Sequence, residues 1–231
     1  MAEENIYAPP SASLEPTPIA GEVSLARPFR GLPKLVCALM LVDLITNISG
    51  SCFSWLSLLL SAEFMEDVPG RWSSVVGVTT TALDGAISIT YLLCVIFFSK
   101  WIYRAHVNAK AYDYPMRFSP AWAVGSFFVP IVCIFRPYQA MKELWIASAG
   151  PRYEGTRELR VWWALWFVVG IVPLLLWWAI PSSLAEQEIL VLDGVVELIS
   201  IGLYILLYRA AATIVRTITE YQETDERLVV E

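Results

Sequence analysis

Four long apolar runs constrain this chain more than any other feature of its sequence. They cover residues 35–60, 75–100, 161–181 and 189–209, and each reaches the length of about 20 residues that a helix needs to span a bilayer. A chain with 57% hydrophobic and only 16% charged residues is also too apolar for an ordinary soluble domain. The runs therefore predict an all-α fold that crosses a membrane several times.

The positions of the basic residues predict the orientation of these helices. If residues 118–135 enter and leave the membrane on one side, every Lys and Arg except Arg71 lies on a single face. If that segment crosses instead, the 16 basic residues divide seven against nine. Because Lys and Arg favour cytoplasmic loops, we expect four transmembrane helices plus a re-entrant or interfacial helical hairpin at 118–135. Both termini are then cytoplasmic.

The hairpin segment has an apolar run that Pro120, Gly125 and Pro130 interrupt. Each leg has about nine residues, or about 13 Å as a helix, which reaches towards the middle of a bilayer. Broken backbone at that depth is tolerated only where protein or a water-filled cavity covers its polar groups. We therefore expect this segment to lie at the centre of the helix bundle.

Two tails flank a predicted membrane domain over residues 34–216. Residues 1–33 carry six prolines and little apolar periodicity, which predicts a disordered cytoplasmic tail. Residues 217–231 are rich in glutamate, which predicts an acidic cytoplasmic tail. The net charge of −6 lies in these two tails, and no basic patch suited to nucleic acid is present.

Small residues recur at four-residue intervals on the first two predicted helices. We name these sets the first ridge, with Thr46, Gly50 and Ser54, and the second ridge, with Gly77, Thr81 and Gly85. Small residues at this spacing let two membrane helices approach closely. We expect the two ridges to pack against each other or against another helix.

Several polar side chains fall inside the apolar runs, and five of them form a predicted polar layer: Asp43, Asn47, Asp84, Asp193 and Glu197. At about 1.5 Å per residue, three of them, Asn47, Asp84 and Glu197, lie at similar depths of about 10–14 Å from the outer surface. An unpaired carboxylate there must be protonated, bind a cation or meet water. The layer is therefore a candidate proton- or cation-binding site. The alternative is that protonated acids join the helices through hydrogen bonds to Thr80, Thr90, Tyr91 or Ser200.

A motif lies between the second and third apolar runs, as WIYRAHVNAKA followed by RFSPAWAVGSFFVPIVCIFRPYQAMKELWIAS. It resembles a bacterial multi-pass membrane family, domain-of-unknown-function family 4328, whose pattern reads W-x-Y-R-A-x-x-N, R-x-S-P-G-W-A-V-G and P-I-x-N-L-x-R-P-Y-Q-A-M-x-E. Ala121 and Cys133 stand where that pattern has Gly and Asn. The resemblance implies a helical fold in a bacterial inner membrane and supplies no activity. The matching positions include Arg104, Asn108, Arg117, Pro120, Trp122, Gly125, Pro130, Arg136, Pro137, Tyr138, Gln139 and Glu143.

The cations of this motif have two interpretations. Together with Lys110 and Lys142 they can hold anionic lipid head groups, at about 1 kcal/mol for each charge near an anionic leaflet. The simpler alternative is that they only set the orientation of the chain. A hydrogen-bonded pairing of Arg104 and Arg136 with Glu143 is also consistent with the spacing.

An enzymatic function has little support in the sequence. No glycine-rich phosphate loop, HExxH or GxSxG motif is present, and we interpret His106 as a solvated interfacial residue. We therefore expect a non-catalytic membrane protein, a scaffold, sensor or accessory subunit, with no cofactor or metal. Its expected partners are membrane lipids and a protein at the cytoplasmic face or tails. The alternative is a small proton- or cation-coupled transporter or channel component that uses the polar layer.

Overall fold

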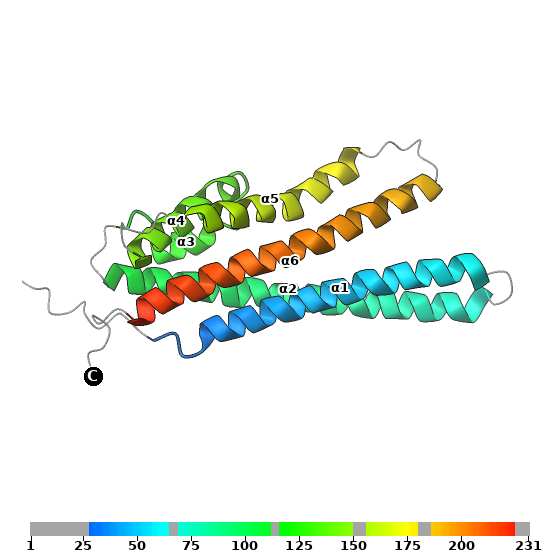
Figure 1. Ribbon diagram of the computed structural model, residues 1–231, viewed down its shortest axis with the longest axis horizontal. Helices are drawn as coiled ribbons and strands as arrows, with labels where there is room; N and C mark the ends of the chain where they lie inside the picture. Colours follow the sequence, from blue (N-terminus) through cyan, green and yellow to red (C-terminus); the bar gives the residue numbers. More distant parts are fainter. Residues whose placement is uncertain (1–27, 65–68, 112–115, 150–155, 180–185, 225–231) are drawn as a thin grey trace, which may run out of the picture.

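The computed structural model describes residues 28–64, 69–111, 116–149, 156–179 and 186–224. Within these ranges the chain forms only helices, which confirms the all-α expectation (Figure 1). The helices are α1 (Leu32–Phe64), α2 (Pro69–Ala111), α3 (Pro120–Gly125), the 3₁₀ helix η2 (Val132–Ile134), α4 (Arg136–Ala149), α5 (Thr156–Ala179) and α6 (Glu186–Thr224).

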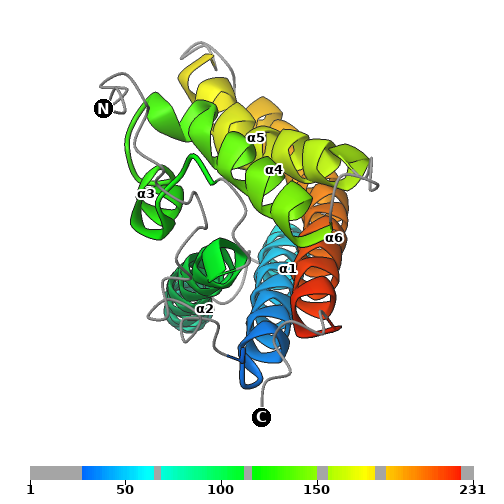
Figure 2. The ribbon, with the colours of Figure 1, turned by 90° about the vertical axis from the view of Figure 1, so that its left-hand side faces the viewer.

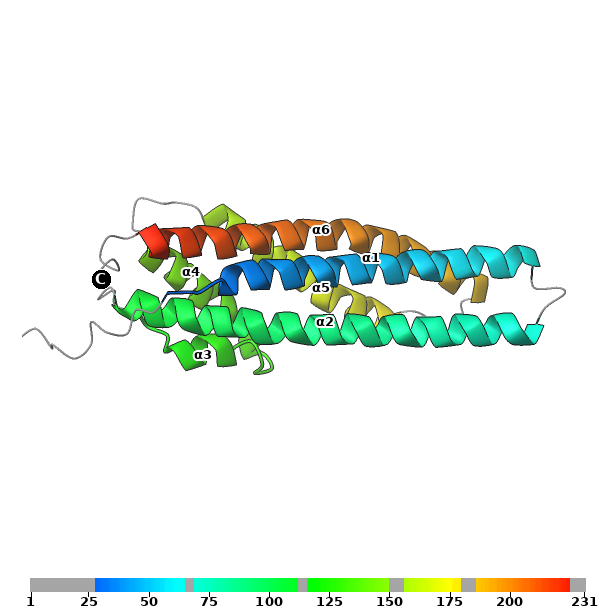
Figure 3. The same cartoon turned by 90° about the horizontal axis from the view of Figure 1, so that it is seen from below.

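The four long helices form an elongated bundle. Figure 1 shows that the first residues of α1 and the last residues of α2 and α6 lie together at one end of this bundle. We call it the head end. The short helices α3 and α4 lie there too. Seen from below, α1 runs between α2 and α6, and it contacts both (Figure 3). Helix α5 packs against α6.

Within the described residues, three helices are long and apolar enough to cross a membrane. These stretches are Leu32–Ser57 in α1, Ser74–Ala111 in α2 and Gly194–Thr224 in α6. Large apolar side chains such as Val78 (72% exposed) and Leu198 (60% exposed) point outwards from them. Exposed apolar surface on this scale suits a hydrocarbon environment better than water.

Helix α5 corresponds to the remaining apolar run, predicted over 161–181. Its backbone is described from Thr156 to Ala179. The side chains of 171–174 and 176–179 lie outside the described residues.

The ends of the helical region differ from the predicted tails. Helix α6 continues to Thr224, so the tail predicted over 217–231 begins inside it. Phe29, within the tail predicted over 1–33, is only 4% exposed and belongs to the core. The last turns of α6 have a face of mixed polar and apolar residues, which packs on other helices without raising local hydropathy. Residues 1–27 and 225–231 lie outside the described part.

Most of the buried side chains gather at the head end, in what we call the head core. Helices α2, α4, α5 and α6 supply its largest members, all 3% exposed or less: Trp101, Ile102, Met141, Leu144, Trp145, Leu159, Trp162, Ile214, Val215 and Ile218. The Trp101 ring stacks on Phe98 with ring centroids 5.6 Å apart. Dense packing of this kind fixes how the helices meet.

Buried hydrogen bonds join the helices of the head core. The Trp101 indole N–H donates to the Thr219 hydroxyl at 3.2 Å, which links α2 to α6. The Gln222 amide donates to the Ala105 carbonyl at 3.1 Å and to the Ser148 hydroxyl at 2.8 Å. One side chain near the end of α6 therefore bonds to both α2 and α4, in a place where an unbonded amide is unfavourable.

The two ridges of small residues have different surroundings. A Cβ on Gly50 would lie 3.0 Å from Cδ1 of Ile87, and the hydroxyls of Thr46 and Thr90 are 3.2 Å apart, so the first ridge packs against α2. The second ridge is exposed, and a Cβ on either of its glycines would meet no atom within 4 Å. Within the described residues, the expectation that the second ridge packs on another helix is therefore wrong.

The segment 118–135 lies at the periphery and not at the centre of the bundle, as Figure 2 shows from the head end. Helix α3 contacts α2 and α4 and, among the described elements, no other helix. Between α3 and η2 the chain reverses through a tight turn in which the Val132 N–H donates to the Pro130 carbonyl at 2.7 Å. Ile131, at its centre, has φ 67° and ψ −47°. This is close to the classic γ-turn, a rare and strained conformation for a β-branched residue.

Candidate functional site

Three of the five predicted polar-layer residues line one cavity. Asn47 of α1, Asp84 of α2 and Glu197 of α6 surround a space of about 150 Å³, together with Ser51 and Thr80. They meet because α1 contacts both α2 and α6. Helical rise alone predicts that they share a depth, and the structure adds that they share a side of the bundle.

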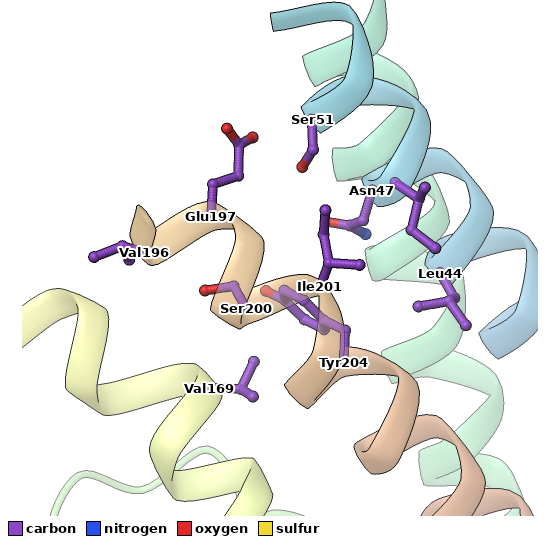
Figure 4. Close-up of a pocket in the computed structure, with 10 residues that line it drawn as sticks. Leu44, Asn47, Ser51, Val169, Val196, Glu197, Ser200, Ile201 and Tyr204 are labelled. Carbon is purple, nitrogen blue, oxygen red and sulfur yellow. The ribbon is translucent and has the colours of Figure 1, made fainter. Parts of the chain in front are cut away.

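A larger cavity of about 470 Å³ adjoins the first, between α1, α5 and α6. It shares Asn47, Ser51 and Glu197 with the smaller one and adds Ser200 and Tyr204. Figure 4 shows the Glu197 carboxylate and the Ser51 hydroxyl at the same opening between α6 and α1. Sequence reasoning omits Ser51 and Tyr204 from the layer. Helical spacing could have found them, since they follow Asn47 and Glu197 by four and seven positions.

The two acids of the smaller cavity accept no hydrogen bond from any residue that the structure describes. Asp84 is exposed and Glu197 is half-buried. The Thr80 hydroxyl donates to the Val76 carbonyl, and the Ser88 hydroxyl donates to the backbone carbonyl of Asp84. For Asp84 and Glu197, the alternative in which acids join the helices by hydrogen bonds therefore has no support.

Asp43 does join two helices. Its Oδ1 accepts a hydrogen bond from the Thr90 hydroxyl at 3.0 Å, which links α1 to α2. Its backbone carbonyl accepts from the Asn47 amide at 2.8 Å. Asp43 lines neither cavity. The side chain of Asp193 lies outside the described residues.

The hairpin does not close the polar layer. Neither cavity has a lining residue from 118–135, and α3 touches only α2 and α4 among the described helices. A hairpin at the centre of the bundle could have sealed the site from below, and this segment does not do so. The cavities lie between the long helices, whereas the motif supplies much of the head core, including Trp101, Met141 and Trp145.

The motif residues around α3 have local structural roles. The Glu143 carboxylate accepts hydrogen bonds from two backbone N–H groups, those of Arg117 and, at 3.2 Å, Phe118. Ser119 caps α3 by accepting from the Trp122 N–H at 3.1 Å, and Pro120 occupies the first helical position. A serine cap followed by proline is a favourable helix start. Glu143 therefore anchors the beginning of α3 to α4.

Two arginines of the motif also bond to the protein. Arg104 donates to the Pro28 carbonyl at 3.0 Å, which ties the approach to α1 onto α2. Arg136 donates to the Gln139 side chain at 3.4 Å, and its guanidinium carbon lies 5.8 Å from the Phe118 ring centroid. The remaining motif positions are buried (Asn108, Pro137), half-buried (Pro120, Gly125, Tyr138) or exposed (Trp122, Pro130).

His106 is fully buried in the head core, so its interpretation as a solvated residue is wrong. Its Nδ1 lies 2.9 Å from the Ile102 carbonyl, which accepts a hydrogen bond from the Nδ1–H group. Nε2 has no hydrogen-bond partner among the described residues. Within those residues, no group of three or more His, Cys, Asp or Glu side chains is placed to hold a metal ion.

The described residues thus define an all-helical protein with three helices able to cross a membrane, a dense core at one end and polar cavities between its long helices. The chain belongs to the family described as Domain of unknown function (DUF4328), whose model matches residues 72–220. That match confirms the family resemblance of the motif and includes Asp84 and Glu197. Neither a curated protein nor a solved structure matches this chain.

Proposed function

We propose that this chain is a non-catalytic multi-pass protein of the bacterial inner membrane, and that it acts as a scaffold, sensor or accessory subunit. One observation carries the proposal. The dense packing lies at the head end, whereas the apolar lengths of α1, α2 and α6 expose their side chains. A soluble bundle would bury such faces, so these lengths suit lipid.

Helix lengths and charges support a particular placement. Helix α2 has 43 residues and is therefore about 64 Å long, about twice the hydrocarbon thickness of a bilayer. A membrane around its apolar part leaves the head core in the cytoplasm, where exposed cations such as Lys34, Lys110, Lys142 and Arg157 are favoured. In this placement α1, α2, α5 and α6 all cross, and both termini are cytoplasmic.

The turn between α3 and η2 forms the tip of the hairpin. Phe128, Ile131 and Phe135 are 61–75% exposed there. Helix α3 has six residues, or about 9 Å, which is too short to reach the bilayer centre. We propose that the tip enters the near leaflet only. The strain at Ile131, on the order of 1–3 kcal/mol, then serves to hold an apolar side chain outwards.

Cysteine labelling tests this placement. In a cysteine-free background, Glu66→Cys should react with a membrane-impermeant maleimide in intact cells. Arg136→Cys and Arg160→Cys should react only after the membrane is permeabilised. Labelling of either arginine position in intact cells would contradict the placement, because it would put 118–135 across the bilayer.

A second candidate function has its own observation. Asn47, Asp84 and Glu197 share a cavity, and neither acid has a hydrogen-bond donor among the described residues. Carboxylates within a membrane span are unfavourable unless they are protonated, hydrated or bound to a cation. The layer then serves as the proton- or cation-binding site of a small transporter or channel component.

Substitutions in this layer test the second function. In liposomes containing the purified protein, Asp84→Asn and Glu197→Gln should each lower the flux of H⁺ or Na⁺ at least about tenfold, because each removes a charge that the ion needs. Glu158→Gln, at an exposed position in the first turn of α5, is the matched control. Equal flux through all four proteins, or no flux above empty liposomes, would exclude this function.

A further inference from the structure

A third cavity, which neither the motif nor the polar layer uses, lies between the beginning of α1 and the end of α6. Its volume is about 580 Å³. We call it the end groove. Figure 3 shows these two helix ends side by side at the head end. Four charged side chains line the end groove, Lys34, Arg216, Glu220 and Glu223, and all four are exposed.

The end groove changes character along its length. On α1 the lining begins with Pro33 and Lys34 and continues to Leu41, about 12 Å from its start along the helix. On α6 it runs from Thr224 back to Tyr208, about 24 Å away. Charge therefore lies towards the head end and apolar surface towards the middle of the bundle. In the proposed placement, this is the order in which a phospholipid of the cytoplasmic leaflet presents its head group and its chains.

The charges of the end groove indicate which head group fits. Lys34 on α1 and Arg216, Glu220 and Glu223 on α6 line one space, and within the described residues no ion pair joins any of the four. The sum of these charges is zero. A lipid with a phosphate alone would meet both carboxylates as like charges, whereas a phosphate carrying an ammonium group would satisfy both signs.

We propose that the end groove binds one zwitterionic phospholipid whose head group carries a primary ammonium. Lys34 and Arg216 bind its phosphate, and Glu220 and Glu223 accept hydrogen bonds from its ammonium. An acyl chain lies along the apolar part of the end groove. The three N–H donors of a primary ammonium distinguish this lipid from a choline lipid, which has none. The inference rests on the proposed membrane placement and adds a lipid partner to it.

Native mass spectrometry of the full chain in detergent provides the test. The probes are phosphatidylethanolamine, phosphatidylcholine and phosphatidylglycerol with identical acyl chains, offered at equal concentration to delipidated protein. We expect the ethanolamine lipid to bind several-fold better than either of the others. The double variant K34Q/R216Q should lose about tenfold in affinity for it. The variant E220Q/E223Q should lose the preference and bind the glycerol lipid better.

Matched controls use exposed charges outside the end groove. The variants K142Q/R157Q and E158Q should keep the wild-type preference. Equal or better binding of the glycerol lipid by the wild type would overturn the proposal, as would equal losses in the end-groove and control variants. If removal of residues 1–26 raised lipid binding tenfold, the chain's own leading segment would be the occupant instead. Cysteine labelling tests the membrane placement independently of lipid binding. If labelling confirmed the placement but the protein showed no head-group preference, only the proposal of a lipid site in the end groove would be refuted.

Discussion

Replacing Trp101 by alanine is expected to lower the free energy of unfolding of the head core by about 3–5 kcal/mol. The Trp101 side chain is 0% exposed, stacks on Phe98 and donates its indole N–H to Thr219. The substitution leaves a cavity where α2 meets α6 and also removes a buried hydrogen bond. Thermal unfolding in detergent and hydrogen exchange of residues 101–111 measure the effect.

Two matched variants separate the contributions at this position. Thr219→Val removes the hydrogen-bond acceptor and keeps the volume, so its expected effect is the smaller cost of an unpaired buried N–H, about 1–3 kcal/mol. Trp122→Ala removes the same side chain from an exposed position, where Trp122 is 45% exposed, and should change stability little. If Trp101→Ala and Trp122→Ala destabilised the protein equally, the head core would not be its main source of stability.

Replacing Gly194 by alanine is expected to destabilise the contact of α1 with α6. A Cβ on Gly194 would overlap Cζ2 and Cη2 of Trp55, so the indole must move. Overpacking of this kind costs about 1–3 kcal/mol. Gly202 lies eight residues further along α6 with nothing within 4 Å of its Cβ position. Gly202→Ala should therefore gain up to about 1 kcal/mol from helix propensity.

A second substitution in the partner helix tests whether the indole is the cause. Trp55→Leu shortens the side chain that meets Gly194, so Gly194→Ala should no longer destabilise the protein in that background. The coupling between the two positions is the measured quantity, obtained from unfolding of the four proteins of a double-mutant cycle. Additive effects would show that Gly194 is required for another reason, such as local backbone geometry.

Much of the helical architecture can be predicted from apolar length and spacing. The runs at 35–60 and 75–100 identify α1 and most of α2, because an apolar run of that length has few other stable forms. The depth of the polar layer follows equally directly from the rise per residue. Asn47, Asp84 and Glu197 could therefore be grouped without a structure.

The rotation of each helix about its axis is harder to predict. Errors in this rotation explain why the predicted surroundings of Asp43 and His106 differ from those in the structure. Asp43 and Asn47 share a helix face, yet Asp43 bonds to Thr90 while Asn47 lines the cavities. Packing against neighbouring helices determines which of the two side chains faces the cavities, and this cannot be inferred from the spacing of residues within one helix. His106 had a usable signal, because Ile102 and Ala109 lie on the same helix face, which the head core buries.

The turn at Ile131 could not be predicted from residue preferences. Positive φ is expected at glycine or asparagine, and a β-branched residue argues against it. Residue preferences favour a chain reversal at Gly125, but the chain turns six residues later, at Ile131. Among the described elements, η2 contacts only α4, which follows it directly in the chain, so residue preferences do not place this turn.

The composition of the head core sets an order of events during synthesis. Trp101 and Ala105 leave the ribosome well before their hydrogen-bond partners on α6, which are Thr219 and Gln222 respectively. The first two long helices can therefore enter a bilayer before α6 has been synthesised to pack against the end of α2. Nascent chains stalled before residue 219 should consequently carry an open, aggregation-prone face, and a holdase or a pause in translation would have its greatest effect in that interval.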